Sequence, residues 1–261
     1  IDLDWSIPCP GYLEFGIRTF KCWLEGGHGK MKLLSGIQRS CDVFFYKLML
    51  EVELETWNDY MKRFGFGSRT GIDLPGEVAG LVPDKEYFDK RDGINGWTKG
   101  NLLNLAIGQG ETLVTPFQMA MFALKIGNNG RYHEPHLLEY YENSTTGERR
   151  YENYDQFSVP GISDDTFEIL KRGMNMVVDT QNGTAKSARV PGIKVAGKTG
   201  TAQNSQGEDH AMFISFAPLE DPEIAISVIV ENAGMGSAVA APIAGRIMRY
   251  YFSSKNKFAQ N

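Results

Sequence analysis

Residues 196–203 read AGKTGTAQ and open the part of the chain in which strand patterns replace helical ones. β-Branched or alternating residues fill 193–203, 210–217 and 223–231. The EDPE turn at 220–223 joins the last two segments as a hairpin, because a short polar turn between two strand-like runs is typical of antiparallel pairing. The stretch therefore predicts an antiparallel sheet near the end of the chain.

The chain upstream of this sheet has mainly helical patterns. Two or three helices in series are expected from Lys32 to about Phe64, and another between Thr115-Pro116 and the GNNG turn at 127–130. A further helix is expected from the cap Ser163 to about Val178, and a last one, after the sheet, over about 240–252. The expected loops are 1–30, the turns of 64–80, an exposed connection over 83–101, and a hairpin or surface loop over 140–157. Helices followed by an antiparallel sheet predict one α/β domain, its sheet flanked by helices.

Composition limits the classes of protein that fit. A chain of 261 residues can bury a substantial core, and its net charge of −5, from 27 basic and 32 acidic side chains, argues against a nucleic-acid partner. The longest apolar runs, such as IAISVIV at 224–230, are far shorter than the ~20 residues of a membrane helix. The first residues lack both a methionine and a signal-peptide pattern, so we expect a fragment or processed piece of a longer chain.

The first stretch that carries chemistry is Lys198-Thr199-Gly200-Thr201. On an edge strand, a lysine and a hydroxyl that face one cleft bind a substrate carboxylate, and Gly200 leaves room for a ligand backbone. The amide of Thr201 then points at a developing oxyanion. The alternative is the end of a strand with a solvated lysine, and these four residues alone leave both possibilities open.

The second stretch is QRSCDVFFY at 38–46. Ser40 and Asp42 are two residues apart, so in a turn or extended segment they share a side while Cys41 faces the other. A serine hydroxyl in a cleft relays a proton, and Asp42 accepts a hydrogen bond that orients the relay or the substrate. Taken alone, Ser-Cys-Asp before an aromatic helix is more often a helix cap.

Together the two stretches resemble the second and third motifs of the penicillin-recognising serine transpeptidases, Ser-x-Asn/Asp and Lys-Thr/Ser-Gly. The surrounding sequence is similar to the penicillin-binding protein 2 family, the class B transpeptidases of cell elongation. The matching stretches are CPGYLEFG, GGHGK, SCDVFFY, FGFGSRTGIDLPGE, NLAIGQGETLVTPFQMA and GKTGTAQ with DHAMFISFAP. The resemblance runs from Cys9 to about Arg246 and implies the β-lactamase-like fold of the penicillin-binding transpeptidases.

This resemblance implies peptidoglycan crosslinking. A serine attacks the D-Ala-D-Ala end of a stem peptide, and an amine of a neighbouring peptide takes the acyl group; β-lactams acylate the same serine. Lys198 and Thr199 would hold the carboxylate of substrate or drug, and the amide of Thr201 would give half of the oxyanion hole. Ser40 would pass protons, while Asp42 replaces the asparagine of many relatives.

The resemblance also implies partners and a location. The partners would be stem peptides, β-lactams and proteins of the wall-elongation complex, with no nucleic acid. The location would be the periplasmic face of the bacterial inner membrane, reached through a membrane anchor outside these residues. Two rival functions stay open: a β-lactam-hydrolysing or β-lactam-sensing relative, and a non-catalytic zinc-stapled scaffold of the wall-synthesis complex.

The nucleophile of the family lies in a Ser-x-x-Lys motif some tens of residues before Ser-x-Asp, and no such motif precedes Ser40. The literal match Ser254-Lys255-Asn256-Lys257 follows the expected last helix in a polar tail, which argues against a catalytic pair. We therefore expect the nucleophile upstream of residue 1 and an inactive fragment.

The three cysteines and one histidine of the first segment form a further candidate site. Cys9, Cys22, His28 and Cys41 have 12, 5 and 12 residues between them, and three thiolates with one imidazole are a complete tetrahedral set for structural Zn²⁺. Relatives are described with a metal near the active site and aspartates at some of these positions. The alternatives are a Cys9–Cys22 disulfide with Cys41 free, or three unlinked thiols.

The other histidines, His133, His136 and His210, are expected to be structural or exposed. The chain is expected to divide into a zinc-stapled segment at 1–41, a mainly helical part at 42–190, and a sheet hairpin with a C-terminal helix at 191–252, all within one transpeptidase domain over 1–261.

Overall fold

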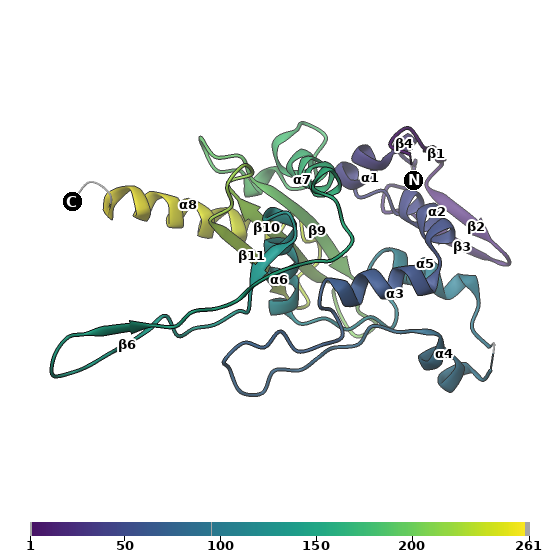
Figure 1. Ribbon diagram of the computed structural model, residues 1–261. Coiled ribbons are helices and arrows are strands. Elements are labelled where there is room, and N and C mark those ends of the chain that lie inside the picture. Colours follow the sequence, from purple (N-terminus) through teal and green to yellow (C-terminus); the bar gives the residue numbers. More distant parts are fainter. Residues whose placement is uncertain (1, 95, 259–261) are drawn as a thin grey trace.

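The computed structural model describes residues 2–94 and 96–258 (Figure 1). Its first half contains β1 (Ser6–Cys9), β2 (Tyr12–Phe15), β3 (Arg18–Lys21), β4 (Gly29–Lys32), α1 (Leu33–Arg39), α2 (Asp42–Val52), α3 (Leu54–Arg63), α4 (Lys85–Asp92), α5 (Lys99–Ala106) and α6 (Pro116–Gly127). Its second half contains β5 (Arg131–His133), β6 (Tyr140–Glu142), β7 (Arg149–Tyr151), β8 (Gln156–Ser158), α7 (Asp164–Asp179), a 3-10 turn (Lys186–Ala188), β9 (Ala196–Ala202), β10 (His210–Ala217), β11 (Ile224–Val230) and α8 (Ala240–Phe258).

A three-stranded antiparallel sheet in the order β11-β10-β9 forms the centre of the molecule. The register pairs Lys198 with Ile214 and Thr199 with Phe213, and on the other side of β10 it pairs Phe213 with Val228. Strand β9 is therefore an edge strand, and no other strand of the described residues pairs with its free side. The edge that carries Lys198 is open to a ligand.

Helices cover both faces of this sheet, because β10 is apolar on both sides. On one face Ile214 and Phe216 pack with residues of α6 and α7, including Ala123 and Met174. On the other face Phe213 packs in the cluster that contains much of α8. This arrangement confirms the predicted α/β fold with an antiparallel sheet flanked by helices.

The first segment packs beside α2 as two small ladders, β1 with β4 and β2 with β3. The cysteine side chains lie in an apolar cluster with Phe44 of α2, which is fully buried. The prediction of loops and turns over 1–30 is wrong, because these strands of four residues are too short to show an alternating pattern.

The prediction of an exposed connection over 83–101 is also wrong, since α4 and the start of α5 lie there. Helix α4 buries only Phe88 and so has no apolar stripe to read. Local contacts stabilise it instead: Asp84 caps its start by accepting the Tyr87 N–H at 2.8 Å, and Lys85 pairs with Asp89 one turn later.

The remaining helices lie close to their predicted places. Thr115 caps α6 by accepting the N–H of Gln118, and Ser163 caps α7. Helix α8 runs to Phe258, beyond the predicted end near 252, so Ser254 and Lys255 lie on a helix and the predicted polar tail is wrong there. The division of the chain into parts that end at 41 and 190 stays a prediction. The predicted outer limits of the domain, residues 1 and 261, fall outside the described residues.

The hairpin β6–β7 lies within the predicted hairpin at 140–157 and extends away from the body of the molecule (Figure 1). Across 2–94 and 96–258, the helices are all too short or too polar to cross a membrane.

Candidate functional site

A cleft of about 550 Å³ lies between the free edge of β9 and the turn that joins α1 to α2. Its walls include all six residues of the two predicted motifs: Ser40, Asp42, Lys198, Thr199, Gly200 and Thr201. The two motifs are 158 residues apart in sequence at Ser40 and Lys198, so the fold brings them together.

The closest contact across the cleft joins Lys198 to Ser40. The Nζ of Lys198 donates a hydrogen bond to Ser40 Oγ at 2.5 Å and another to the carbonyl of Thr199 at 2.8 Å. Burial lowers the pKa of Lys198 to about 8, whereas the charge of Asp42 acts in the opposite direction. A lysine with a pKa near neutrality exchanges a proton with a neighbouring hydroxyl more readily than an exposed lysine does.

Ser40 and Asp42 owe their positions to the sharp turn between two helices. Ser40 ends α1 with φ of 50°, a left-handed conformation that is uncommon for a residue other than glycine. Asp42 begins α2 and accepts the backbone N–H of Trp23 at 2.8 Å. Burial raises the pKa of Asp42 to about 6, and the hydrogen bond from Trp23 opposes that rise.

The strand β9 presents its threonines on the cleft side. Thr199 Oγ1 lies 3.0 Å from Thr184 Oγ1, and Gln109 Nε2 donates to the carbonyl of Thr201 at 3.3 Å. In a strand the N–H and C=O of one residue point to the same side, and Gln109 contacts the carbonyl of Thr201 at the free edge, so the N–H of Thr201 faces that edge as well. A Cβ on Gly200 would come 3.2 Å from Met212 Cβ. The lack of a side chain at Gly200 therefore also lets β9 pack closely against Met212 of β10.

The four predicted metal ligands, Cys9, Cys22, His28 and Cys41, form a buried cluster. Their ligand atoms all lie within 4.8 Å of one another, and the three cysteines are free thiols, so the alternative Cys9–Cys22 disulfide is absent among them. The Nδ1 of His28 lies 3.6 Å from Cys9 Sγ and 3.4 Å from Cys22 Sγ.

These distances test whether the cluster fits a metal. Tetrahedral zinc with bonds of about 2.3 Å to sulfur and about 2.0 Å to nitrogen places S and N about 3.5 Å apart. The two separations measured from His28 Nδ1 are 3.6 and 3.4 Å, so the donor set has the size and chemistry of a zinc site. Four protein ligands leave no open position, which is typical of a structural site.

The ionisable groups of the cluster shift one another's pKa. A hydrogen bond from Cys41 lowers the pKa of Cys22 to about 4, and the same contact raises the pKa of Cys41 above its usual range. Burial lowers the pKa of His28, which favours the neutral ring that a metal ligand needs. The Nε2 of His28 is buried without a hydrogen-bond partner among the described residues, and its ring packs edge-on against Trp23.

The cluster and the cleft share a wall. Trp23 follows Cys22 directly and donates its backbone N–H to Asp42 and its indole N–H to the carbonyl of Arg39 at 3.0 Å. Cys41 stands between Ser40 and Asp42. Anything that holds Cys22 and Cys41 together therefore also holds the turn that carries Ser40 and Asp42.

Sequence reasoning missed much of the cleft lining, including Trp23, Gln109 and Thr184. Gln109 lies between two glycines after a helix, a pattern that predicts a polar side chain at a helix end. Thr184 and Trp23 carry no comparable signal, because their roles depend on contacts with residues distant in sequence.

The residues expected to have no catalytic role lie elsewhere. Lys255 pairs with Glu223 at 2.5 Å, and neither it nor Ser254 lines the cleft. His136 stacks on Tyr154, and His133 contacts backbone carbonyls. A second cavity of about 670 Å³, between α6 and β5, contains none of the predicted site residues in its lining.

Comparison with known proteins covers nearly the whole chain. Residues 1–249 match the model of the penicillin binding protein transpeptidase domain. The peptidoglycan D,D-transpeptidase MrdA of Haemophilus influenzae is 35% identical over 267 residues, which cover 94% of this chain and 40% of that protein. The chain thus spans about 40% of the length of this relative.

Two solved structures are also similar. Penicillin-binding protein 2 (PBP2) of Helicobacter pylori, in complex with MreC, has a TM-score of 0.83 and 32% identity over 97% of this chain and 46% of that one. Penicillin-binding protein 3 of Mycobacterium tuberculosis, complexed with ampicillin, has a TM-score of 0.79 and 29% identity over 97% of this chain and 57% of that one.

Proposed function

Because this chain belongs to the family of penicillin-binding protein transpeptidase domains, with PBP2-type relatives, we propose that it forms one wall of the active site of a peptidoglycan D,D-transpeptidase. The reaction breaks the peptide bond between the two alanines of a stem peptide ending in D-Ala-D-Ala, releases the terminal D-alanine, and transfers the acyl group to an amine of a neighbouring peptide. The observation that carries the proposal is the hydrogen bond between Lys198 and Ser40, which joins the two motifs in one cleft.

Each cleft residue has a role in this proposal. The ammonium of Lys198 and the hydroxyl of Thr199, which Thr184 orients, bind the carboxylate of the substrate. Ser40 passes a proton between Lys198 and the reacting group. The backbone N–H of Thr201 faces the free edge of β9 and stabilises the oxyanion.

The proposal places the nucleophilic serine outside residues 1–261, in a Ser-x-x-Lys segment that completes the cleft. The absence of a Ser-x-x-Lys motif before Ser40 supports it. On this account residues 1–261 alone have no acyl-transfer activity, because a covalent intermediate needs the nucleophile.

We propose that the Cys9, Cys22, His28 and Cys41 cluster holds a structural Zn²⁺. The metal would add folding free energy to a segment whose strands are only four residues long, on the order of 10 kcal/mol for structural zinc sites. Through Cys41 the cluster would hold the backbone directly before Asp42, and through Cys22 and the neighbouring Trp23 it would hold the carboxylate of Asp42, with no direct part in acyl transfer.

We also propose partners and a location. The relative from H. pylori is solved with MreC, so the intact protein would assemble with proteins of the wall-elongation complex. The relative from M. tuberculosis is solved with ampicillin, and β-lactams would acylate this protein in the same way. Its substrate lies outside the cytoplasm, so the protein would act at the outer face of the inner membrane.

Fluorescent penicillin tests the proposal. The intact protein should become labelled with about one penicillin per chain, and residues 1–261 alone should remain unlabelled, because only the intact protein has the nucleophile. The adduct should persist, since a transpeptidase deacylates slowly. Rapid hydrolysis of the penicillin would instead support a β-lactam-hydrolysing relative, and absence of labelling in the intact protein would support a scaffold.

The acylation rate should also depend on pH in a defined direction. Burial lowers the pKa of Lys198 from its ordinary 10.5 to about 8, so the ammonium that attracts the carboxylate is present below pH 8 and is lost above it. We expect the second-order rate constant for acylation by a penicillin to fall as the pH rises from about 8 to 10. A Lys198→Arg variant, which stays charged, should show no such fall; a rate constant of the unchanged protein that is constant to about pH 10 would contradict this role.

A further inference from the structure

Gln109 points its side chain into the cleft but has no part in the proposed chemistry. Its Nε2 donates to the carbonyl of Thr201, on the free edge of β9, at 3.3 Å. The two residues are 92 positions apart, so this contact depends on where the end of α5 lies in the fold.

The backbone of Gln109 is fixed by the way α5 ends. Gly108 has φ of +74°, a left-handed conformation, and its N–H donates to the carbonyl of Leu105 at 3.0 Å. The N–H of Gln109 donates to the carbonyl of Asn104, also at 3.0 Å. These two bonds form a Schellman motif, which sets the direction in which the chain leaves the helix.

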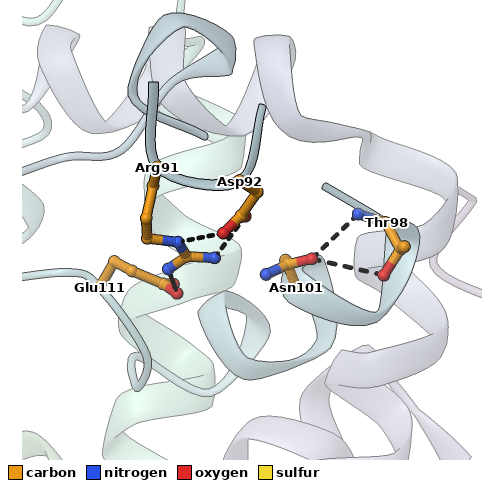
Figure 2. A network of polar contacts seen from close by, with 5 residues as sticks. All are labelled: Arg91, Asp92, Thr98, Asn101 and Glu111. Atoms are coloured by element: carbon orange, nitrogen blue, oxygen red, sulfur yellow. Dashed lines mark hydrogen bonds and ion pairs between the residues drawn. The ribbon is translucent and has the colours of Figure 1, made fainter. Parts of the chain in front are cut away.

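A network of polar contacts holds the segment that follows α5 and contains Gln109 and Glu111 (Figure 2). The guanidinium of Arg91 hydrogen-bonds to Asp92 and, across the loop, to Glu111, two residues after Gln109. Thr98 and Asn101 form a capping box at the start of α5. Gln109 therefore lies between the end of α5 and Glu111, both of which are held by hydrogen bonds. Its side chain points toward β9.

The position of this carboxamide matters because it places a donor beside Thr201 at the free edge of β9; Gln203 and Ser237 are further polar residues of the cleft lining. Asp42 only accepts hydrogen bonds when ionised, and Lys198 already donates to Ser40 and Thr199. The amide nitrogen of Gln109 carries two hydrogens, and one of them is enough for Thr201. The second N–H is available to a ligand that lies along β9.

We propose that Gln109 is a substrate-binding residue that donates this second N–H to a main-chain carbonyl of the donor stem peptide. An extended peptide that pairs with a free strand edge needs hydrogen-bond donors and acceptors spaced like those of a main chain. The carboxamide of Gln109, held beside Thr201, adds one N–H donor to the edge of β9. The inference rests on the proposed function and names the part of the substrate that the site recognises.

Two classes of β-lactam test it in the intact protein. A penicillin such as benzylpenicillin carries an acylamide side chain, whose carbonyl corresponds to the peptide carbonyl, whereas a carbapenem carries a hydroxyethyl group there. Gln109→Ala should lower the second-order rate constant for acylation by benzylpenicillin about tenfold, as expected for one hydrogen bond. Gln109→Glu, which has only acceptors when ionised, should lower it at least as much.

Acylation of both variants by the carbapenem should stay within about twofold of the unchanged protein, which also shows that the variants are folded. Gln206→Ala, at an exposed glutamine outside the cleft lining, is the matched control and should change neither rate. Equal losses with both compounds, or no loss with benzylpenicillin, would overturn the inference. If the unchanged protein is acylated by neither compound, the proposed function fails, and this inference fails with it.

Discussion

Replacing Lys198 by alanine in the intact protein should lower the rate constant for acylation by a penicillin at least about a thousandfold. The change removes the hydrogen bond to Ser40 at 2.5 Å and the positive charge that we propose binds the carboxylate. Loss of a general acid–base group alone costs about a hundredfold to ten thousandfold in rate. The measurement is the time course of labelling by a fluorescent penicillin at several concentrations.

Lys194 offers a matched control for this variant. It lies four residues earlier, is exposed, and pairs with Glu220 on the surface. Lys194→Ala should therefore acylate at the unchanged rate, because exposed ion pairs contribute little. A Lys198→Ala protein that melts within a few degrees of the unchanged protein and still acylates within about tenfold of its rate would remove Lys198 from the mechanism.

Replacing Cys22 by serine should lower the zinc content from about one per chain to well below one, and the melting temperature by about 10 °C or more. Removing one ligand of a tetrahedral site forfeits several kcal/mol of metal-linked folding free energy, and 1 kcal/mol corresponds to about 2–4 °C in a protein of this size. Acylation should also slow, because Trp23, the next residue, holds Asp42 at 2.8 Å. Elemental analysis and thermal unfolding measure the first two effects.

Chelation provides an internal control. A strong chelator should shift the melting temperature of the unchanged protein toward that of Cys22→Ser and leave the variant itself unaffected. Cys22→Asp, which replaces the thiolate by an anionic carboxylate ligand, should retain more zinc than the serine variant, whose hydroxyl is neutral. Protein purified without chelators that contains no metal would rule out the zinc proposal.

The parts of the fold with regular patterns were predictable from sequence. The hairpin over β10 and β11 and the capped starts of α6 and α7 follow from strand-like runs and from Thr115 and Ser163. The strands within residues 1–30 were not, because four-residue ladders show no period and their pairing is set by contacts with α2. Helix α4 was not either, since a helix that buries only Phe88 has no stripe to detect.

The candidate site divides in a similar way. Ser40, Asp42 and Lys198 were predictable as a group because two motifs with complementary chemistry imply a common cleft. The grouping of Cys9, Cys22, His28 and Cys41 was predictable because their residue types form a complete donor set for zinc. Gln109 and Thr184 were not, since each acts on β9 through a contact with a residue distant in sequence.

The chemical identity of the acylated residue tests the central claim most directly. The intact protein would be treated with a penicillin, digested, and mapped by mass spectrometry to find the serine that carries the adduct. The account predicts one adduct on a serine outside residues 1–261, in a Ser-x-x-Lys motif, and none on Ser40. An adduct on Ser40 would make Lys198 and Ser40 the nucleophilic pair, and an adduct on Ser254 would place the chemistry on α8; either result would contradict the site described here.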